Sequence, residues 1–285
     1  MASHDKGNTY VGEVTLKVQD LDRMLTFYKE MIGFQVLEQT EGKAILTANG
    51  KTALLSLEQR EDLQPKQQRT AGLYHFALLL PNRSDLAKVL IHLAKNNVQL
   101  GASDHSVSEA IYLSDPEGNG IEIYSDRPED TWTWNNGEVG MVTEPLDAEN
   151  LIQEAKGESW NGLPVGTVMG HIHLHVSNLQ ETEKFYHEGL GFESVLQFGS
   201  QALFMSTGKY HHHIGLNTWA GAGVPASPEN SPGLKQFILE YPDEEKRNQA
   251  VENLKNIGAD VREESGIIRT TDPSGNVIQL NVQSV

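Results

Sequence analysis

The feature that most constrains the fold of this chain is an internal repeat. Residues 11–34 read VGEVTLKVQDLDRMLTFYKEMIGF, and residues 169–192 read MGHIHLHVSNLQETEKFYHEGLGF. At a constant offset, both segments contain a glycine, alternating apolar positions, a Phe-Tyr pair and a closing Gly-Phe. Such self-similarity indicates a fold built from repeated supersecondary modules.

A second pair of similar segments extends the repeat. Residues 72–81 (GLYHFALLLP) match residues 233–242 (GLKQFILEYP). Each is followed by a stretch with helical spacing and then by a turn and a strand, DPEGNGIEIY from Asp115 and DPSGNVIQLN from Asp272. The proline and the Gly-Asn pair are typical of tight turns. Four modules therefore begin near residues 11, 72, 170 and 233.

Each module is predicted to contain one strand, one helix and three further strands. In the first module, alternation over residues 14–18 predicts a strand, and apolar spacing over residues 21–28 predicts a helix that ends at Gly33. A βαβββ module of about 50 residues is too small to bury a sheet face alone, so we expect the modules to pair. The later strands of the first module are expected at residues 34–38, 43–47 and 52–57.

The repeat also predicts the domain organisation. Residues 9–126 hold the first module pair, and residues 169–285 hold the second pair. Residues 127–168 connect them and include a short amphipathic stretch at residues 148–155. Because long structureless linkers are uncommon in compact proteins, we expect this connection to pack on the surface.

Composition excludes several classes of site and partner. The 285 residues include no cysteine, which excludes disulfides, thiolate nucleophiles and Cys-ligated metals. The formal charge of −17 disfavours nucleic acid and anionic membranes as partners. The start of the sequence lacks an apolar signal-peptide core, and the longest apolar run, Phe76 to Leu80, is too short to span a bilayer. We therefore expect a cytoplasmic protein whose chemistry depends on its 11 histidines.

Four βαβββ modules with the V-x-D-L-x-x-x-x-x-F-Y-x-x-x-x-G-F signature of residues 18–34 resemble the vicinal oxygen chelate superfamily. This superfamily includes glyoxalase I, the bleomycin-resistance proteins and the extradiol ring-cleaving dioxygenases. The runs GLYHFALLLP, DHSVSEAIYLSDPEGNG and GHIHLHV make the chain most similar to the bacillus-type catechol 2,3-dioxygenases. The resemblance implies an α+β fold in which four βαβββ modules pair into two cupped mixed β-sheets. It also implies a divalent metal, held by residues of the first and last strands of the modules.

The metal ligands implied by the resemblance come from modules two and three. No sequential pair of modules carries the family's two His and one Glu, whereas these two modules together carry His75, Glu122 and His171. This departs from the usual extradiol order and predicts that module two packs on module three, within one chain or between subunits. The first-strand position is Glu13, His75, His171 and Gln236 in the four modules, and the last-strand position is Glu122 in module two and Gln279 in module four.

The resemblance also implies catalytic residues beside the metal. Tyr112 lies ten residues before Glu122, and His105 lies a little further upstream. Both would form hydrogen bonds to the substrate and the oxygenated intermediates. An acid–base histidine is implied on a predicted strand in the run YHHHIGL. Adjacent strand residues face opposite sides, and the alignment favours His212 over His213, with His211 as the remaining candidate.

Each candidate also has a purely structural interpretation. A single histidine in an apolar strand, such as His75, is more often a core side chain. Glu122 facing inward without a partner would cost several kcal/mol, roughly, and would require a cation. His171, His173 and His175 alternate along one strand and share one side. The repeat offset favours His171 as the ligand, with the other two lining the site.

Two histidines and one carboxylate leave three positions of an octahedral cation open, which suits non-haem Fe(II). The resemblance thus implies an Fe(II)-dependent extradiol dioxygenase that adds both atoms of O2 to a catechol-like diol. Mn(II) is the alternative cofactor. The implied partners are a small aromatic diol and O2, and a homo-oligomer remains open.

Two other functions are weighed against this one. A glyoxalase-like lyase or isomerase using Ni, Zn or Mn would commonly need two carboxylate ligands, and only Glu122 has the right setting. A non-enzymatic drug-binding resistance protein needs no metal ligands, so the intact set of His75, Glu122 and His171 disfavours it.

Overall fold

The computed structural model describes residues 2–4 and 7–283 and divides into two compact units. Neither unit is a contiguous half of the chain, so the division at residues 127–168 stays a prediction from the repeat. Unit 1 is bounded by Met1–Lys17, Asp62–Tyr74 and Gly170–Val285, and unit 2 by Val18–Glu61 and His75–Met169.

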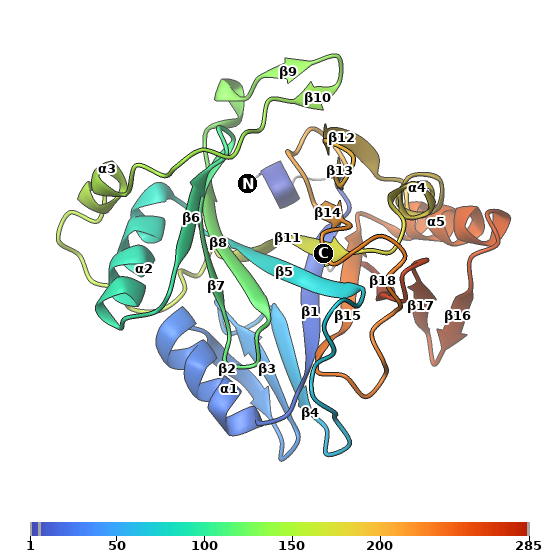
Figure 1. The fold of residues 1–285 in the computed structure, drawn as a ribbon, viewed down its shortest axis with the longest axis horizontal. Helices are drawn as coiled ribbons and strands as arrows, with labels where there is room; N and C mark the ends of the chain where they lie inside the picture. The colour runs from blue at the N-terminus through green and yellow to red at the C-terminus, as the bar shows by residue number, and fades with distance from the viewer. Residues whose placement is uncertain (1, 5–6, 284–285) are drawn as a thin grey trace. The chain divides into compact units, whose positions relative to one another are not determined.

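All four modules have the predicted order of strand, helix and three strands (Figure 1). The first contains β1 (Tyr10–Val18), α1 (Leu21–Phe27) with the π-helical turn η2 (Tyr28–Ile32), β2 (Gln35–Gln39), β3 (Lys43–Thr47) and β4 (Leu55–Gln59). The second contains β5 (Gly72–Leu79), α2 (Arg83–Lys95), β6 (Gly101–Asp104), β7 (Ser108–Ser114) and β8 (Gly120–Asp126).

The second half of the chain repeats this order. The third module contains β11 (Val168–His175), α4 (Leu179–Lys184) with the π-helical turn η4 (Phe185–Gly189), β12 (Glu193–Phe198), β13 (Ala202–Ser206) and β14 (Ile214–Asn217). The fourth contains β15 (Gly233–Tyr241), α5 (Glu244–Asn256), β16 (Val261–Glu264), β17 (Ile267–Thr271) and β18 (Val277–Val282). A short 3₁₀ turn, η1 (Ala2–His4), precedes the first module.

The modules pair into two eight-stranded mixed sheets, which confirms the predicted α+β class. One sheet holds the strands of modules one and four, and the other holds those of modules two and three. Within unit 1 the strand orders are β16-β17-β18-β15-β1 and β12-β13-β14-β11; within unit 2 they are β4-β3-β2 and β5-β8-β7-β6.

Each module helix begins at an Asp or Asn whose side chain accepts a backbone N–H of the first turn. This cap satisfies a donor that has no partner within the helix. The first helix ends as predicted, because its π-helical turn closes at Gly33 with a left-handed φ of 95°. The capping residues are Asp20, Asn82, Asn178 and Asp243.

A buried hydrogen bond in unit 2 joins the two sequence motifs that mark the repeat. The hydroxyl of Tyr28, from the Phe-Tyr pair, donates to Oδ2 of Asp115 at 2.8 Å. Asp115 begins the DPEGN turn and also accepts the backbone N–H groups of Glu117 and Asn119. Burial, reinforced by the charge of Asp115, raises the pKa of Tyr28 well above 10, so its hydroxyl stays protonated and donates.

Unit 1 repeats this bond with the equivalent residues. Tyr186 donates to Oδ2 of Asp272 at 3.3 Å, and Asp272 accepts the backbone N–H groups of Ser274 and Asn276. Burial raises the pKa of both Tyr186 and Asp272. The Phe-Tyr motif and the Asp-Pro turn therefore have one structural reason to recur together.

The connection at residues 127–168 belongs to unit 2 and packs against its second module. It contains the turn η3 (Glu129–Thr131), a ribbon of β9 (Trp134–Asn135) and β10 (Glu138–Val139), and α3 (Ala148–Gln153). Helix α3 lies beside α2 (Figure 1). Leu151 and Ala155 are buried there, and the hydroxyl of Ser84 donates to the carbonyl of Glu154 at 2.9 Å.

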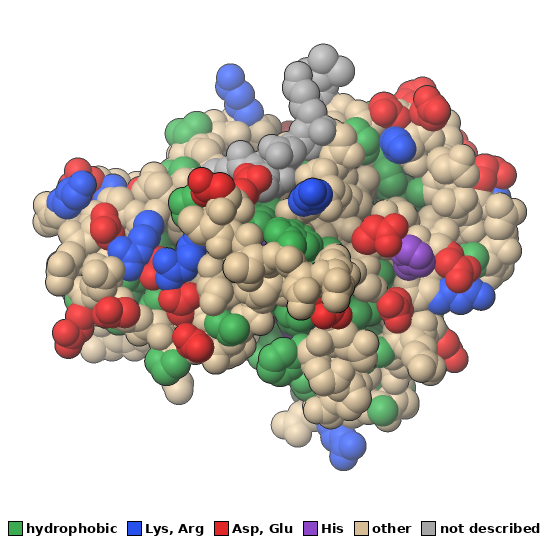
Figure 2. Space-filling view, turned by 90° about the horizontal axis from the view of Figure 1, so that it is seen from above, with side chains coloured by type: hydrophobic (Ala, Val, Ile, Leu, Met, Phe, Trp, Pro, Cys, Tyr) green, Lys and Arg blue, Asp and Glu red, His purple; other side chains and the backbone are tan. Residues whose placement is uncertain are grey.

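Among the residues described, no helix has the length and apolar character to cross a membrane. Acidic and basic side chains are interspersed on the face drawn in Figure 2. The residues visible on that face form no continuous basic stripe of the kind that binds a nucleic-acid backbone.

We expect Asp115→Ala to lower the free energy of unfolding by about 2–4 kcal/mol, because several buried donors lose their acceptor together. Tyr28→Phe removes only one of these donors and should cost about 1 kcal/mol. Urea unfolding followed by circular dichroism measures both values. A loss below about 0.5 kcal/mol for Asp115→Ala would contradict a stabilising role for this bond.

Candidate metal centre

Unit 2 brings two of the predicted ligands together. His75 lies on β5, and Glu122 lies on the neighbouring parallel strand β8, opposite Ala77. Nε2 of His75 is 3.1 Å from Oε2 of Glu122, with only 8% and 5% of the two side chains exposed. Glu122 therefore faces inward, as the metal hypothesis requires.

The distance between these two atoms has a direct chemical meaning. Histidine nitrogen and carboxylate oxygen bind divalent transition metals at about 2.1 Å. Two donors bound to one ion at a right angle therefore lie about 3.0 Å apart. The observed 3.1 Å between Nε2 of His75 and Oε2 of Glu122 fits two adjacent ligands of one ion, and it is also an ordinary distance for an ion pair.

Tyr112 shares the face of Glu122 and is bonded to His105. Tyr112 on β7 lies directly opposite Glu122 on β8, and its ring centroid is 5.8 Å from that of His75. Its hydroxyl lies 2.7 Å from Nε2 of His105, whose Nδ1 lies 2.6 Å from the carbonyl oxygen of Val142. Because a carbonyl only accepts, Nδ1 carries the hydrogen and a neutral His105 accepts from Tyr112 through Nε2.

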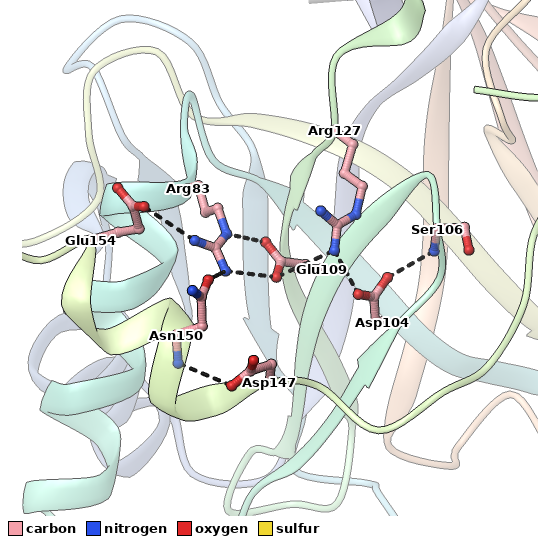
Figure 3. A network of polar contacts seen from close by, with 8 residues as sticks. All are labelled: Arg83, Asp104, Ser106, Glu109, Arg127, Asp147, Asn150 and Glu154. Atoms are coloured by element: carbon pink, nitrogen blue, oxygen red, sulfur yellow. Dashed lines mark hydrogen bonds and ion pairs between the residues drawn. The ribbon is translucent and has the colours of Figure 1, made fainter. Parts of the chain in front are cut away.

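The turn that presents His105 is held by charged side chains of unit 2 (Figure 3). Asp104 accepts the backbone N–H of Ser106 and pairs with Arg127. The backbones of Asp104 and Glu144 exchange hydrogen bonds of 2.8 and 2.9 Å. The connecting segment thus fixes both the turn and the Val142 carbonyl on His105.

A buried carboxylate extends this network to α3. Glu109 is 3% exposed and lies between two guanidinium groups, with two hydrogen bonds from Arg83 and an ion pair to Arg127 (Figure 3). Arg83 also donates to Asn150 on α3 and to Glu154 just after it. Buried charge is tolerated where it is paired in this way.

In unit 1, the third predicted ligand lies beside the predicted acid–base histidine. His171 on β11 is 1% exposed, and its ring centroid lies 4.1 Å from that of His212. Nδ1 of His212 is 2.8 Å from Nδ1 of His211. His173 and His175 follow on the same strand, as the alternation predicts.

One sequence-based expectation about the three consecutive histidines is wrong. They precede β14, which begins at Ile214, so the alternation of a strand does not govern their directions. His213 is enclosed by backbone: its Nδ1 accepts the N–H of Thr207 at 3.3 Å, and its Nε2 donates to the carbonyl of Ser3 at 2.8 Å. Burial lowers the pKa of His213 to about 3, although the bond to Ser3 opposes this shift.

The equivalent positions of module four carry amides that bond to each other. Nε2 of Gln236 donates to Oε1 of Gln279 at 3.2 Å, and Gln279 in turn donates to Asn281 at 2.9 Å. Arg269 donates to Gln236 at 3.2 Å. These strand positions therefore hold uncharged side chains as readily as ionisable ones, so the fold itself does not require His75 or Glu122.

His75, Glu122 and His171 form a group of buried side chains, among the residues described, that could hold a metal ion. Their donor set, two imidazole nitrogens and a carboxylate, fits a first-row divalent metal with open positions. The set contains no thiolate, because the chain has no cysteine.

Comparison with known proteins shows the family of this chain. The family model of the Glyoxalase/Bleomycin resistance protein/Dioxygenase superfamily matches residues 10–123 and 168–280. The chain belongs to this superfamily. Catechol-2,3-dioxygenase of Bacillus subtilis (strain 168) is 45% identical over 269 residues, which cover 93% of this chain and 94% of that relative. Glyoxalase I of Zea mays shares the fold, with a TM-score of 0.58 and 16% identity over 95% of this chain and 92% of that structure.

The sequence analysis did not identify some residues that contact the candidate site residues. Val142 acts through its carbonyl, which no side-chain pattern can reveal. Phe204 on β13 lies 5.0 Å from His212 between ring centroids, and its only signal was an apolar strand position. Tyr74 was visible only as a neighbour of His75, yet its ring lies 5.1 Å from that of His173.

We expect His213 to make the fold sensitive to acid. Its pKa is about 3 in the folded chain, against an ordinary value of 6.5 that applies when the chain is unfolded. The free energy of unfolding is therefore not reduced by this group above pH 6.5, and it falls as the pH drops toward 3 because the unfolded chain binds the proton first. At pH 5 the loss is about 2 kcal/mol. Urea unfolding at pH 7 and pH 5 measures it.

The matched variants are His213→Asn and His187→Asn, since His187 is exposed. His213→Asn should show a smaller fall in stability between the two pH values than the wild type. His187→Asn should keep the wild-type fall. Equal falls in all three proteins would show that His213 does not titrate on unfolding.

Proposed function

We propose that this protein is an Fe(II)-dependent extradiol dioxygenase that cleaves the ring of a catechol-like diol and adds both atoms of O2 to it. His75, Glu122 and His171 hold the metal. The observation that carries the proposal is the grouping of the buried donors of His75, Glu122 and His171, with the His75–Glu122 distance of 3.1 Å fitting adjacent ligands of one ion. The 45% identity to a catechol-2,3-dioxygenase supports the reaction class.

The iron, when bound, supplies open coordination positions for the two diol oxygens and for O2, which brings both reactants together. The chain supplies a buried environment for the three candidate ligands. His75, Glu122 and His171 are each 6% exposed or less. Low exposure strengthens every polar interaction made at this place, because little water competes for it.

Tyr112 and His105 provide a path for one proton. The hydroxyl of Tyr112 faces the same side of the strands as Glu122 and donates to Nε2 of His105. When Tyr112 binds a diol oxygen, His105 can take the proton that passes through the tyrosine hydroxyl. The Val142 carbonyl keeps the hydrogen of His105 on Nδ1, which leaves Nε2 free to accept it.

We assign the acid–base role to His212 of unit 1. Its ring contacts His171, whereas both nitrogens of His213 are bonded to backbone groups. The lowered pKa of His213 also makes that ring a weak base that stays neutral near pH 7. We therefore assign the proton transfer to His212 and a structural role to His213.

The metal assignment is tested on anaerobically prepared protein loaded with Fe(II) or Mn(II) and given catechol. We expect oxygen uptake with Fe(II), and His75→Ala should lose at least about 10³-fold in activity together with its bound iron. Gln236→Ala, at the same position of module four, is the matched control and should retain both.

Three results would change this assignment. Unchanged iron content in His75→Ala would remove that residue from the site. Uptake with Mn(II) alone would replace the metal. Bound metal without oxygen uptake on any diol would favour the glyoxalase-like lyase.

We expect Tyr112→Phe to lower kcat for catechol about 10²-fold, because the variant cannot pass a proton to His105. Iron content should stay at the wild-type level, since the phenol is not a ligand. Steady-state oxygen uptake and metal analysis on the same sample measure the two quantities. A variant that loses iron in proportion to its activity would show that Tyr112 supports the metal rather than the proton transfer.

A further inference from the structure

A buried carboxylate of unit 2 has no part in the proposed reaction. Glu109 is 3% exposed and lies on β7, three residues before Tyr112, so the two side chains face opposite sides of that strand. Arg83 donates two hydrogen bonds to Glu109, and Arg127 forms an ion pair of 3.4 Å with it (Figure 3). The informative feature of Glu109 is what these two arginines connect.

The two arginines fasten both ends of one segment. Arg127 comes directly after β8 and begins the connection between the module pairs. Arg83 on α2 donates to Oδ1 of Asn150 on α3 at 2.8 Å (Figure 3). Glu109 therefore holds the start of the connection directly and holds its helix through Arg83. Residues 128–149 lie between these two anchors.

The middle of this segment bonds to His105. The backbones of Asp104 and Glu144 exchange two hydrogen bonds, and the N–H of Val142 donates to the carbonyl of His105 at 3.2 Å. The carbonyl of Val142 accepts from Nδ1 of His105, with 2.6 Å between nitrogen and oxygen. The place of this carbonyl therefore depends on a segment whose two ends are anchored at Glu109.

The turn that presents His105 is tied to the same anchor. His105 lies between β6 and β7, and the next residue, Ser106, has a left-handed φ of 65°. This conformation is unfavourable for a residue with a Cβ. The carboxylate of Asp104 accepts the N–H of Ser106 at 2.9 Å and also accepts Nη2 of Arg127. Nη2 of Arg127 thus bridges Asp104 and Glu109.

The Val142 carbonyl decides which nitrogen of His105 carries the hydrogen. A neutral imidazole has one N–H, which can lie on either nitrogen. With the carbonyl at Nδ1, the hydrogen lies there, and Nε2 accepts from the hydroxyl of Tyr112 at 2.7 Å. Without the carbonyl, Nε2 can carry the hydrogen instead. It would then donate to Tyr112 and could not receive a proton from it.

We propose that Glu109 is a positioning residue that fixes the tautomer of His105, because it anchors both ends of the segment that carries Val142. Glu109 acts through Arg83 and Arg127 and touches no reacting group. This inference rests on the proposed function, since it concerns the proton path of that site. The tautomer itself can be measured without metal or substrate.

The first test measures the tautomer by NMR. Protein labelled at its histidine ring nitrogens gives different signals for protonated and unprotonated nitrogens, and His105→Gln identifies the signals of His105. In the metal-free wild type at about pH 8, where an ordinary histidine is neutral, we expect the hydrogen on Nδ1. Glu109→Gln keeps the size of the side chain but removes its charge, and it should shift His105 toward a mixture of both tautomers.

Two further variants make this test specific. Arg83→Gln leaves the pair of Glu109 with Arg127 but releases α3, and it should shift the signals in the same direction. Lys43→Gln removes an ion pair with Glu58 elsewhere in unit 2 and should keep the wild-type signals. Wild-type signals in Glu109→Gln, or an equal shift in Lys43→Gln, would overturn the inference. If Glu109→Gln does not fold, wild-type signals in Arg83→Gln would do so.

The second test measures whether Glu109 acts on the proton path. In the Fe(II)-loaded enzyme, Glu109→Gln should lower kcat for catechol about tenfold, with unchanged iron content. Added to Tyr112→Phe, it should cause no further loss, because the path is already broken in that variant. A further tenfold loss in the double variant would show that Glu109 supports activity by another route.

The two tests separate this inference from the proposed function. If the wild type takes up no oxygen with any diol, the dioxygenase proposal fails, and the NMR signals still decide whether Glu109 fixes the tautomer of His105. If oxygen uptake is normal and the signals of Glu109→Gln equal those of the wild type, only the inference about Glu109 fails.

Discussion

The hydrogen bond between a buried tyrosine and the aspartate of a turn organises each unit of this protein. In unit 2, Tyr28 follows the first helix, and its hydroxyl is held by Asp115, seven residues before Glu122 on β8. The bond therefore links the helix of one module to the turn that precedes β8 of the next, the strand of the candidate ligand Glu122. Because Asp115 also collects backbone donors of its own turn, the strand enters the sheet in one register. Unit 1 contains the same arrangement with Tyr186 and Asp272.

Equivalent positions of different modules show which residues the fold requires and which it does not. Glu122 and Gln279 occupy the same place in their modules, yet one is a buried carboxylate beside a histidine and the other belongs to a chain of amides. The glutamines bond to each other, whereas Glu122 lies within ion-pair distance of His75. A metal site can thus arise in one module and be replaced by hydrogen bonds in another without a change of fold.

The sequence was sufficient to predict the module order, because turn residues and apolar periodicity are local properties. A repeat offset carries a position from one module to another, and on that basis the sequence proposed His75, Glu122 and His171, whose donor atoms form a group that could hold a metal ion. Other features depend on contacts between distant segments and leave no such trace. The partner of His105 is a backbone carbonyl 37 residues away. The directions of His211 to His213 could not follow from alternation, because these residues precede the strand.

The bond between His213 and Ser3 bears on how this protein is handled in the laboratory. Ser3 is fully buried, its carbonyl accepts from His213, and its hydroxyl donates to the carbonyl of Gly170 at 3.3 Å, next to His171. An affinity tag fused ahead of Ser3 would be joined to a residue packed behind the candidate metal ligand. A polyhistidine tag at either end would in addition bring competing imidazoles into any assay of bound metal.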